Sequence, residues 1–283
     1  MRAFAYERPT RLADALALLA EPDSRPLAGG TDLIIRIRDG SVRPTTVVDL
    51  KRIGEFERGI RIEDGWLTIG ARTVMTDLLR DDRIRSDYVA LAEAAAVVGS
   101  VQIRNRATLA GNVCNASPAA DTVPALLVYG ARVLAVGPGG RRTIPIDDVF
   151  VRSGVTTLAP GELVAAVELP LPAGRRGAVH MRRTRRRGHD LASVTLACVI
   201  GTDGVTRLSY GSLGPRPLLA VDQTGVLADP RASDAAKAER LAELFAEASP
   251  SATSMRASPD YRLAMLRVLG MRAIATAAQR LAP

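Results

Sequence analysis

The sequence has 283 residues, a length that allows two ordinary domains with buried cores. Hydrophobic residues make up 47% of it and charged residues 24%, which predicts a folded globular protein and excludes a disordered chain. The formal net charge is +8, but all of the 38 basic residues except Lys51 and Lys237 are arginine, and they are spread along the chain. This pattern indicates codon bias towards GC-rich DNA more than a nucleic-acid-binding surface, so no nucleic-acid partner is expected.

Cysteine and histidine are too rare for a metal centre. Cys114 and Cys198 are the only cysteines, and an iron–sulfur cluster needs about four thiolates. His180 and His189 are the only histidines, which excludes a zinc cage, and no nucleophile-elbow pattern is present. We therefore expect no metal site and no catalytic residue in this chain. Redox chemistry would need a bound organic cofactor or another subunit.

No stretch of the sequence is suited to a membrane. Apolar runs fall well short of the ~18 residues that a membrane span needs. The first seven residues, MRAFAYE, contain one basic residue and no apolar core, unlike a secretory signal. A cytoplasmic protein is expected.

Helical and strand patterns alternate along the chain. In order, they predict a helix over 10–20 with Thr10 as its cap, a strand over 26–28, a helix from 31 or 32 to Gly40, a strand over 46–50, a hairpin of 60–62 with 66–69, helices over 76–79, 88–98 and 124–129, a hairpin of 132–136 with 142–146, a strand over 163–169, strands over 193–200 and 205–213, and helices over 232–248 and 259–280. Residues 170–177 are rich in Pro, Gly and Arg and mark a domain boundary. The predicted fold class is α+β, with domains over 1–173 and 178–283.

The first candidate site is the segment Leu27-Ala28-Gly29-Gly30-Thr31-Asp32-Leu33, which predicts a strand, a tight turn and a helix start. The free N–H groups at a helix start attract anions, and two glycines let a diphosphate approach the backbone. The alternative is a plain turn in which Thr31 or Asp32 caps the helix. The segment alone does not decide between these interpretations.

The second candidate site is the segment 104–121, which is rich in small and hydrogen-bonding residues. It lacks an amphipathic face and predicts a long loop wrapped around a polar ligand. Thr108, Asn112 and Ser117 would offer hydroxyl or amide contacts. Asp121 would accept bonds from ribose hydroxyls or, alternatively, cap the helix that follows at Thr122.

Neither segment is a standard nucleotide motif. No Gly-x-Gly-x-x-Gly opens a βαβ unit, and neither lysine follows a glycine as in a Walker A loop. Elsewhere, Trp66 and Cys114 are expected in the core, and most of the arginine cluster 182–187 on a solvent-facing or partner-facing surface.

Five short segments, taken together and in register, resemble the flavoprotein subunit of the xanthine dehydrogenase and carbon monoxide dehydrogenase family. They are AGGTDL over 28–33, IGA over 69–71, QIRNRATLAGN over 102–112, ASPAAD over 116–121, and the pair DLASV over 190–194 with RASPDYR over 256–262. The resemblance covers essentially the whole chain. It implies a two-lobed FAD-binding domain of the vanillyl-alcohol-oxidase-like type, with lobes of about 1–55 and 56–173. A small C-terminal α+β domain with an antiparallel sheet and helices would follow.

The resemblance also implies a set of FAD contacts. The segments Ala28–Leu33 and Thr108–Asn112 would hold the pyrophosphate, and Ser117 and Asp121 the ribityl and ribose part. Arg182 stands where relatives often have a lysine near the flavin, and Ala110 where many have a second glycine. The predicted FAD contacts are Ala28, Gly29, Gly30, Thr31, Asp32, Leu33, Thr108, Ala110, Gly111, Asn112, Ser117, Asp121, Leu163 and Arg182.

The implied function is electron transfer. In this family a large molybdopterin subunit hydroxylates the substrate, and a small subunit with [2Fe–2S] clusters passes electrons to FAD in the flavoprotein. The final acceptor would be NAD⁺, oxygen or a quinone, and the assembly a dimer of heterotrimers. Two alternatives are a self-contained FAD-dependent oxidase and a binding module without cofactor.

Overall fold

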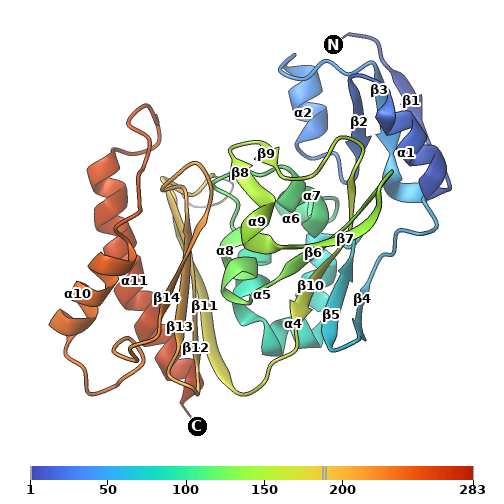
Figure 1. The fold of residues 1–283 in the computed structure, drawn as a ribbon. Coiled ribbons are helices and arrows are strands. Elements are labelled where there is room, and N and C mark those ends of the chain that lie inside the picture. Colours follow the sequence, from blue (N-terminus) through green and yellow to red (C-terminus); the bar gives the residue numbers. More distant parts are fainter. Residues whose placement is uncertain (1, 187, 189, 283) are drawn as a thin grey trace.

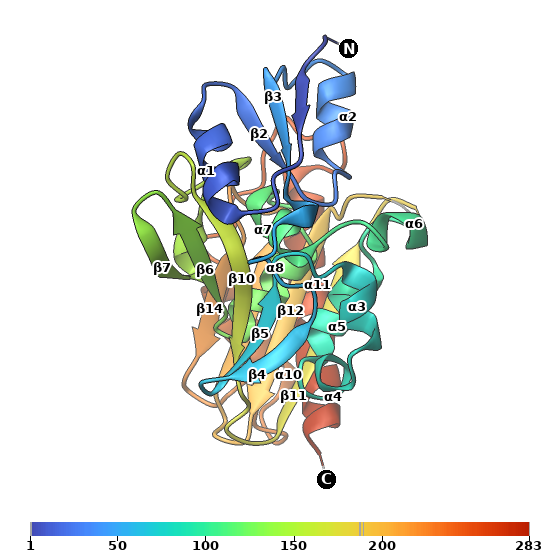
Figure 2. The same ribbon diagram turned by 90° about the vertical axis from the view of Figure 1, so that its right-hand side faces the viewer.

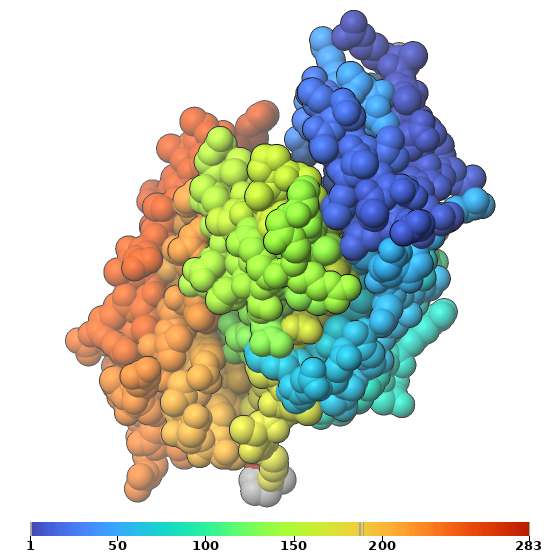
Figure 3. Space-filling view, turned by 45° about the vertical axis from the view of Figure 1, so that its right-hand side comes forward, coloured from blue at the N-terminus to red at the C-terminus, as the bar shows by residue number. Residues whose placement is uncertain are grey.

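The computed structural model describes residues 2–186, 188 and 190–282. The chain forms three successive parts, each built on its own β-sheet, and the two termini lie at opposite ends of the molecule (Figure 1). We call residues 2–55 the N-terminal lobe, 56–173 the central lobe and 174–282 the C-terminal part. The N-terminal lobe stands beside the central lobe at one end (Figure 3). The predicted α+β class is confirmed, with an antiparallel C-terminal sheet and helices.

The N-terminal lobe is a small parallel sheet between two helices. Its elements are β1 (Ala5–Glu7), α1 (Leu12–Ala20), β2 (Ser24–Leu27), α2 (Leu33–Arg38), β3 (Thr46–Asp49) and the 3-10 turn η1 (Leu50–Arg52). The strand order is β1-β3-β2. Neighbouring strand residues face opposite sides, so Val47 packs with Leu27 and Ile37 while Val48 joins the core that contains Ala15. In parallel sheets of this kind ligands bind beyond the carboxyl ends of the strands, where the segment 28–32 leaves β2.

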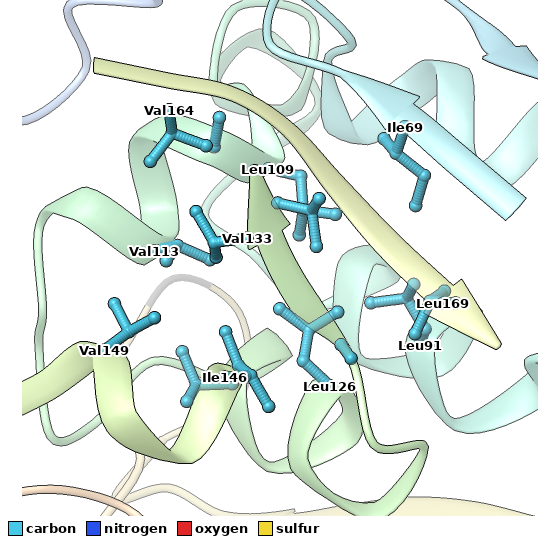
Figure 4. Close-up of a cluster of buried hydrophobic side chains, with 14 of the residues drawn as sticks. Ile69, Leu91, Leu109, Val113, Leu126, Val133, Ile146, Val149, Val164 and Leu169 are labelled. Carbon is cyan, nitrogen blue, oxygen red and sulfur yellow. The ribbon is translucent and has the colours of Figure 1, made fainter. Parts of the chain in front are cut away.

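The central lobe is an antiparallel sheet of order β4-β5-β10-β6-β7, covered by short helices. Its strands are β4 (Ile60–Glu63), β5 (Trp66–Gly70), β6 (Arg132–Gly137), β7 (Gly140–Pro145), β8 (Phe150–Arg152), β9 (Val155–Thr156) and β10 (Leu163–Pro170), of which β8 and β9 pair separately. Its helices are α3 (Met75–Arg80), α4 (Asp82–Asp87), α5 (Val89–Ala96), α6 (Val101–Arg104), α7 (Leu109–Cys114), α8 (Thr122–Val128) and α9 (Ile146–Val149). Apolar side chains from α5, α7 and α8 meet those of the sheet in one core (Figure 4).

The C-terminal part is an antiparallel sheet of order β11-β12-β13-β14. Its elements are β11 (Arg176–Arg183), β12 (Val194–Gly201), β13 (Thr206–Gly211), β14 (Leu218–Asp222), α10 (Asp234–Leu244) and α11 (Pro259–Leu281). Helix α11 contacts one face of β11 and β12, and α5 and α8 contact the other (Figure 2). Both faces are therefore buried: Ala197 and Val199 join the core of the central lobe, and Leu196 and Cys198 the core under α11.

Several expectations about the elements need correction. Thr10 does not cap α1, which begins at Leu12 and has Arg11 at its N-cap position without a side-chain bond. Trp66 is only half-buried, and the Arg132 guanidinium lies 3.5 Å above its ring. The sequence patterns also missed β1, α4, α6, α7, α9, the β8–β9 pair, β11 and β14.

Candidate functional site

A cavity of about 830 Å³ lies where the N-terminal lobe, the central lobe and the C-terminal part meet. Its walls come from parts of residues 25–36, 50–58, 71–74, 97–121 and 158–164, together with Arg182, Asp190 and Leu191. All the residues expected to contact a cofactor line this one cavity: Ala28, Gly29, Gly30, Thr31, Asp32, Leu33, Thr108, Ala110, Gly111, Asn112, Ser117, Asp121, Leu163 and Arg182. Its size suits a large organic ligand.

The first segment needs both of its glycines. A Cβ on Gly29 would lie 2.1 Å from the carbonyl oxygen of Arg106, so the two candidate segments are in backbone contact at this position. Gly30 has φ +78°, a conformation that side chains disfavour. Asp32 occupies the N-cap position of α2 without a capping bond, and its carboxylate instead accepts a hydrogen bond from Asn115 Nδ2 at 3.3 Å. The expectation of a helix cap by the Asp32 side chain is therefore wrong.

The second segment is not a structureless loop, because α7 forms within it. The Thr108 hydroxyl caps this helix by accepting a bond from the Gly111 N–H at 3.0 Å. A Cβ on Gly111 would lie 2.8 Å from that hydroxyl oxygen, so a larger residue here would force the Thr108 side chain to shift. Ala110 lies inside α7, where the helical backbone accepts an alanine without strain.

Two other polar side chains of the segment are tied to neighbouring backbone or side chains. Asn112 Oδ1 accepts a bond from the Thr122 hydroxyl at 2.6 Å. The Ser117 hydroxyl oxygen accepts one from the Ala119 N–H at 3.3 Å. Between them Ala116 has φ +46°, an unfavourable conformation for a residue with a side chain. The chain is thus bent sharply at the cavity wall.

Asp121 occupies the N-cap position of α8, but its side chain makes no capping bond. The interpretation of Asp121 as a helix cap is therefore wrong. Its carboxylate is 9% exposed, and Oδ2 accepts a hydrogen bond from Arg182 Nη1 at 2.8 Å. The other oxygen, Oδ1, is buried and has no hydrogen-bond partner. A buried carboxylate oxygen without a donor is costly, and His180 Nε2 lies 3.5 Å from this one.

Arg182 joins the C-terminal part to the cavity. It lies on β11, and its Nη1 also donates to the carbonyl oxygen of Val97 at 2.9 Å, while Nη2 donates to that of Asp190. Its neighbours Arg183, Arg185 and Arg186 are exposed, as expected of a surface cluster, whereas Arg187 and His189 lie outside the described residues. The guanidinium therefore ties together three segments of the cavity wall.

The cavity is rich in positive charge. Among the described residues, its lining contains seven cationic side chains, of Arg25, Arg36, Lys51, Arg58, Arg72, Arg106 and Arg182, against four carboxylates, of Asp32, Asp121, Glu162 and Asp190. Hydrogen bonds from Arg185 lower the pKa of Asp190 to about 2, so this carboxylate is ionised at neutral pH. An excess of cations suits a ligand that carries phosphate groups.

Sequence reasoning missed several residues of the site. Lys51 follows the end of β3, where the buried Asp49 carboxylate holds its Nζ at 2.7 Å. Arg72 donates to the carbonyl oxygen of Lys51 at 2.8 Å. Cys114 was expected in the core, but it is exposed and lines the cavity. The one sequence signal that could have placed any of these residues at the site was the position of Lys51, directly after the strand predicted over 46–50.

Within residues 2–186, 188 and 190–282, no three His, Cys, Asp or Glu side chains are grouped so that they could hold a metal ion. Among the described helices, none has the length and apolar character needed to cross a bilayer.

Comparisons with known proteins give the same family for both halves of the chain. The family model described as the FAD binding domain in molybdopterin dehydrogenase matches residues 2–172. The model described as the CO dehydrogenase flavoprotein C-terminal domain matches residues 180–277.

Individual relatives are similar to this chain over nearly its whole length. The xanthine dehydrogenase FAD-binding subunit of Escherichia coli O157:H7 is 32% identical over 281 residues, covering 96% of this chain and 95% of its own. The carbon monoxide dehydrogenase medium chain of Afipia carboxidovorans is 30% identical and covers 98% and 97%. A chain of reconstituted CO dehydrogenase from Oligotropha carboxidovorans superimposes with a TM-score of 0.91 at 30% identity, over 99% of each chain. This chain therefore belongs to the family of FAD-binding flavoprotein subunits of the molybdenum-containing dehydrogenases, which includes those of xanthine and carbon monoxide dehydrogenase.

Proposed function

We propose that this subunit holds the FAD through which electrons pass from [2Fe–2S] clusters of a partner subunit to NAD⁺, oxygen or a quinone. The observation that carries the proposal is the cationic cavity lined by both glycine-containing segments, in a chain similar to FAD-binding subunits over nearly its full length. Bound FAD supplies redox chemistry in steps of one or two electrons, while the protein binds and orients it.

The residues present fit FAD. Gly29 and Gly111 allow close backbone approach where the segments 28–33 and 108–112 meet, and the excess of arginine and lysine matches a diphosphate. Ser117 and Asp121 would hold the hydroxyl-bearing ribityl and ribose part. Leu163 and Arg182 would lie towards the flavin end. In this assignment no residue of the chain acts on the substrate.

We also propose the domain organisation on this basis. Residues 1–173 would form the FAD-binding domain, with lobes of about 1–55 and 56–173, and residues 178–283 the C-terminal domain. The separate sheets and the ranges of the two family models, 2–172 and 180–277, support these boundaries.

We propose that the subunit works with a small [2Fe–2S] subunit and a large molybdopterin subunit, as a dimer of heterotrimers. The relatives support this, since they are named medium chains or FAD-binding subunits of larger dehydrogenases. In such an assembly the cavity would hold FAD close to a face that the iron–sulfur partner covers.

The test is to purify the tagged chain from its native host and to measure flavin, iron and molybdenum in the same sample. We expect FAD in about one copy for each chain, together with iron and molybdenum brought by co-purified subunits. A chain that stays alone, binds FAD and oxidises a substrate unaided would overturn the proposal in favour of a self-contained oxidase. A chain that binds no FAD would overturn the cofactor assignment itself.

A further inference from the structure

His180 is buried behind the cavity wall. It lies on β11, its side chain is 2% exposed, and it is not among the residues that line the cavity. Residues two apart on a strand point to the same face, so His180 and Arg182 both face the start of α8. There His180 Nε2 is 3.5 Å from Asp121 Oδ1. Asp121 is thus flanked by Arg182 on one oxygen and by the imidazole on the other.

The hydrogen bonds around Asp121 are incomplete without this histidine. Arg182 serves Oδ2, but Oδ1 is buried and has no partner at hydrogen-bond geometry. His180 Nε2 is also 2.9 Å from the Thr195 hydroxyl oxygen on β12. A ring that carries its proton on Nε2 donates towards both oxygen atoms, and a small movement of the ring would bring Oδ1 within hydrogen-bond distance.

The backbone of His180 is fixed by a separate contact. Its N–H donates to Glu93 Oε2 at 2.8 Å, and Glu93 Oε1 accepts a bond from Arg280 at 2.7 Å. Glu93 lies on α5 and Arg280 on α11, so helices on both sides of the sheet anchor this point of β11. The imidazole is therefore held in place beside Asp121.

We infer that His180 is a positioning residue for the cofactor site, which holds the Asp121 carboxylate by an Nε2–H···Oδ1 hydrogen bond in the orientation that FAD binding needs. The inference rests on the proposed contact between Asp121 and FAD. A packing role alone would be met by an apolar side chain of similar size. Such a side chain would leave Oδ1 without a donor and the carboxylate free to turn.

The test compares two substitutions in the full chain. His180→Gln keeps an N–H donor at the end of the side chain, whereas His180→Leu keeps the bulk and removes the donor. FAD dissociation constants would be measured by the quenching of flavin fluorescence, and the melting temperature of each apoprotein would be recorded. We expect His180→Leu to weaken FAD binding about fivefold, the factor for one hydrogen bond, and His180→Gln to stay within about twofold of the parent.

A double-mutant cycle with Asp121→Ala separates the inference from the assignment of the site. If His180 acts through Asp121, His180→Leu has no further effect on FAD binding once Asp121 is alanine. Equal FAD affinity in His180→Leu and the parent, beside a weakened Asp121→Ala, overturns the role of His180 and leaves the FAD site standing. The same holds if His180→Gln and His180→Leu lose affinity equally. Unchanged affinity in Asp121→Ala overturns the assignment of Asp121 to FAD.

Discussion

Gly29→Ala should separate the two glycine-containing segments that line the cavity. The new Cβ would lie 2.1 Å from the carbonyl oxygen of Arg106, and the nearest carbon of Ala107 is 3.0 Å away. To restore van der Waals distance, the segments 28–32 and 106–111 must move apart by about 1 Å. Overpacking of this kind costs about 1–3 kcal/mol. For a chain of this size that corresponds to a fall in melting temperature of roughly 2–10 °C.

The effect on FAD should be larger than the effect on stability suggests, because both segments are expected to contact the same diphosphate. We expect at least about a tenfold rise in the FAD dissociation constant, equivalent to about 1.4 kcal/mol. Fluorescence titration and thermal melting of the apoprotein measure the two quantities on one sample. Gly139→Ala is the matched control, since a Cβ there meets nothing within 4 Å. Parental FAD affinity and melting temperature in Gly29→Ala would refute the contact between the segments.

Three further predictions concern single side chains. Asp121→Ala should weaken FAD binding by about 1.5–3 kcal/mol, and it should also lower the free energy of unfolding, because Arg182 loses its buried partner. Fluorescence titration and urea unfolding measure the two effects, and a loss of stability without a loss of FAD affinity would contradict the prediction. Thr108→Val should lower the free energy of unfolding by about 1 kcal/mol, because it removes the hydroxyl that accepts a bond from the Gly111 N–H. Urea unfolding measures this loss, with Thr253→Val in an exposed loop as the control substitution. Burial raises the pKa of Asp49, but hydrogen bonds from Lys51 and Tyr6 outweigh burial and hold this pKa below its ordinary value. Asp49→Asn should therefore lower the free energy of unfolding by about 1.5–3 kcal/mol at pH 7. That difference should shrink as the pH falls through the lowered pKa, below about pH 4, and a constant difference from pH 7 to pH 3 would refute the linkage.

Local patterns predicted the elements that depend on nearby residues. The hairpin of β4 and β5 follows from Asp64-Gly65, whose φ values of +49° and +78° are those of a two-residue turn. The two glycine-containing segments were recognised as candidate sites because runs of small residues lack an amphipathic face and let a ligand approach the backbone closely. Their assignment to FAD, however, came from the resemblance to a family.

The missed elements depend on partners far along the chain. Strand β11 has the sequence RGAVHMRR, whose charged ends conceal its strand pattern, and it forms because β12 pairs with it along its length. Helix α7 has too few large apolar residues to be recognised, but Leu109 and Val113 are fully buried against the central sheet. The contacts of Arg182 with Val97 and Asp121 span 85 and 61 residues, and no local pattern encodes them.

The wall that Arg182 completes has a consequence for biosynthesis. A ribosome releases the N-terminal and central lobes first, and at that stage the segments 28–33 and 108–112 are already made. The guanidinium that connects Val97, Asp121 and Asp190 arrives only with β11, which in turn needs β12 as its pairing partner. On the proposed FAD assignment, tight capture of the cofactor would therefore wait until β11 and β12 have emerged and paired, and FAD would enter only after the first two lobes have been made.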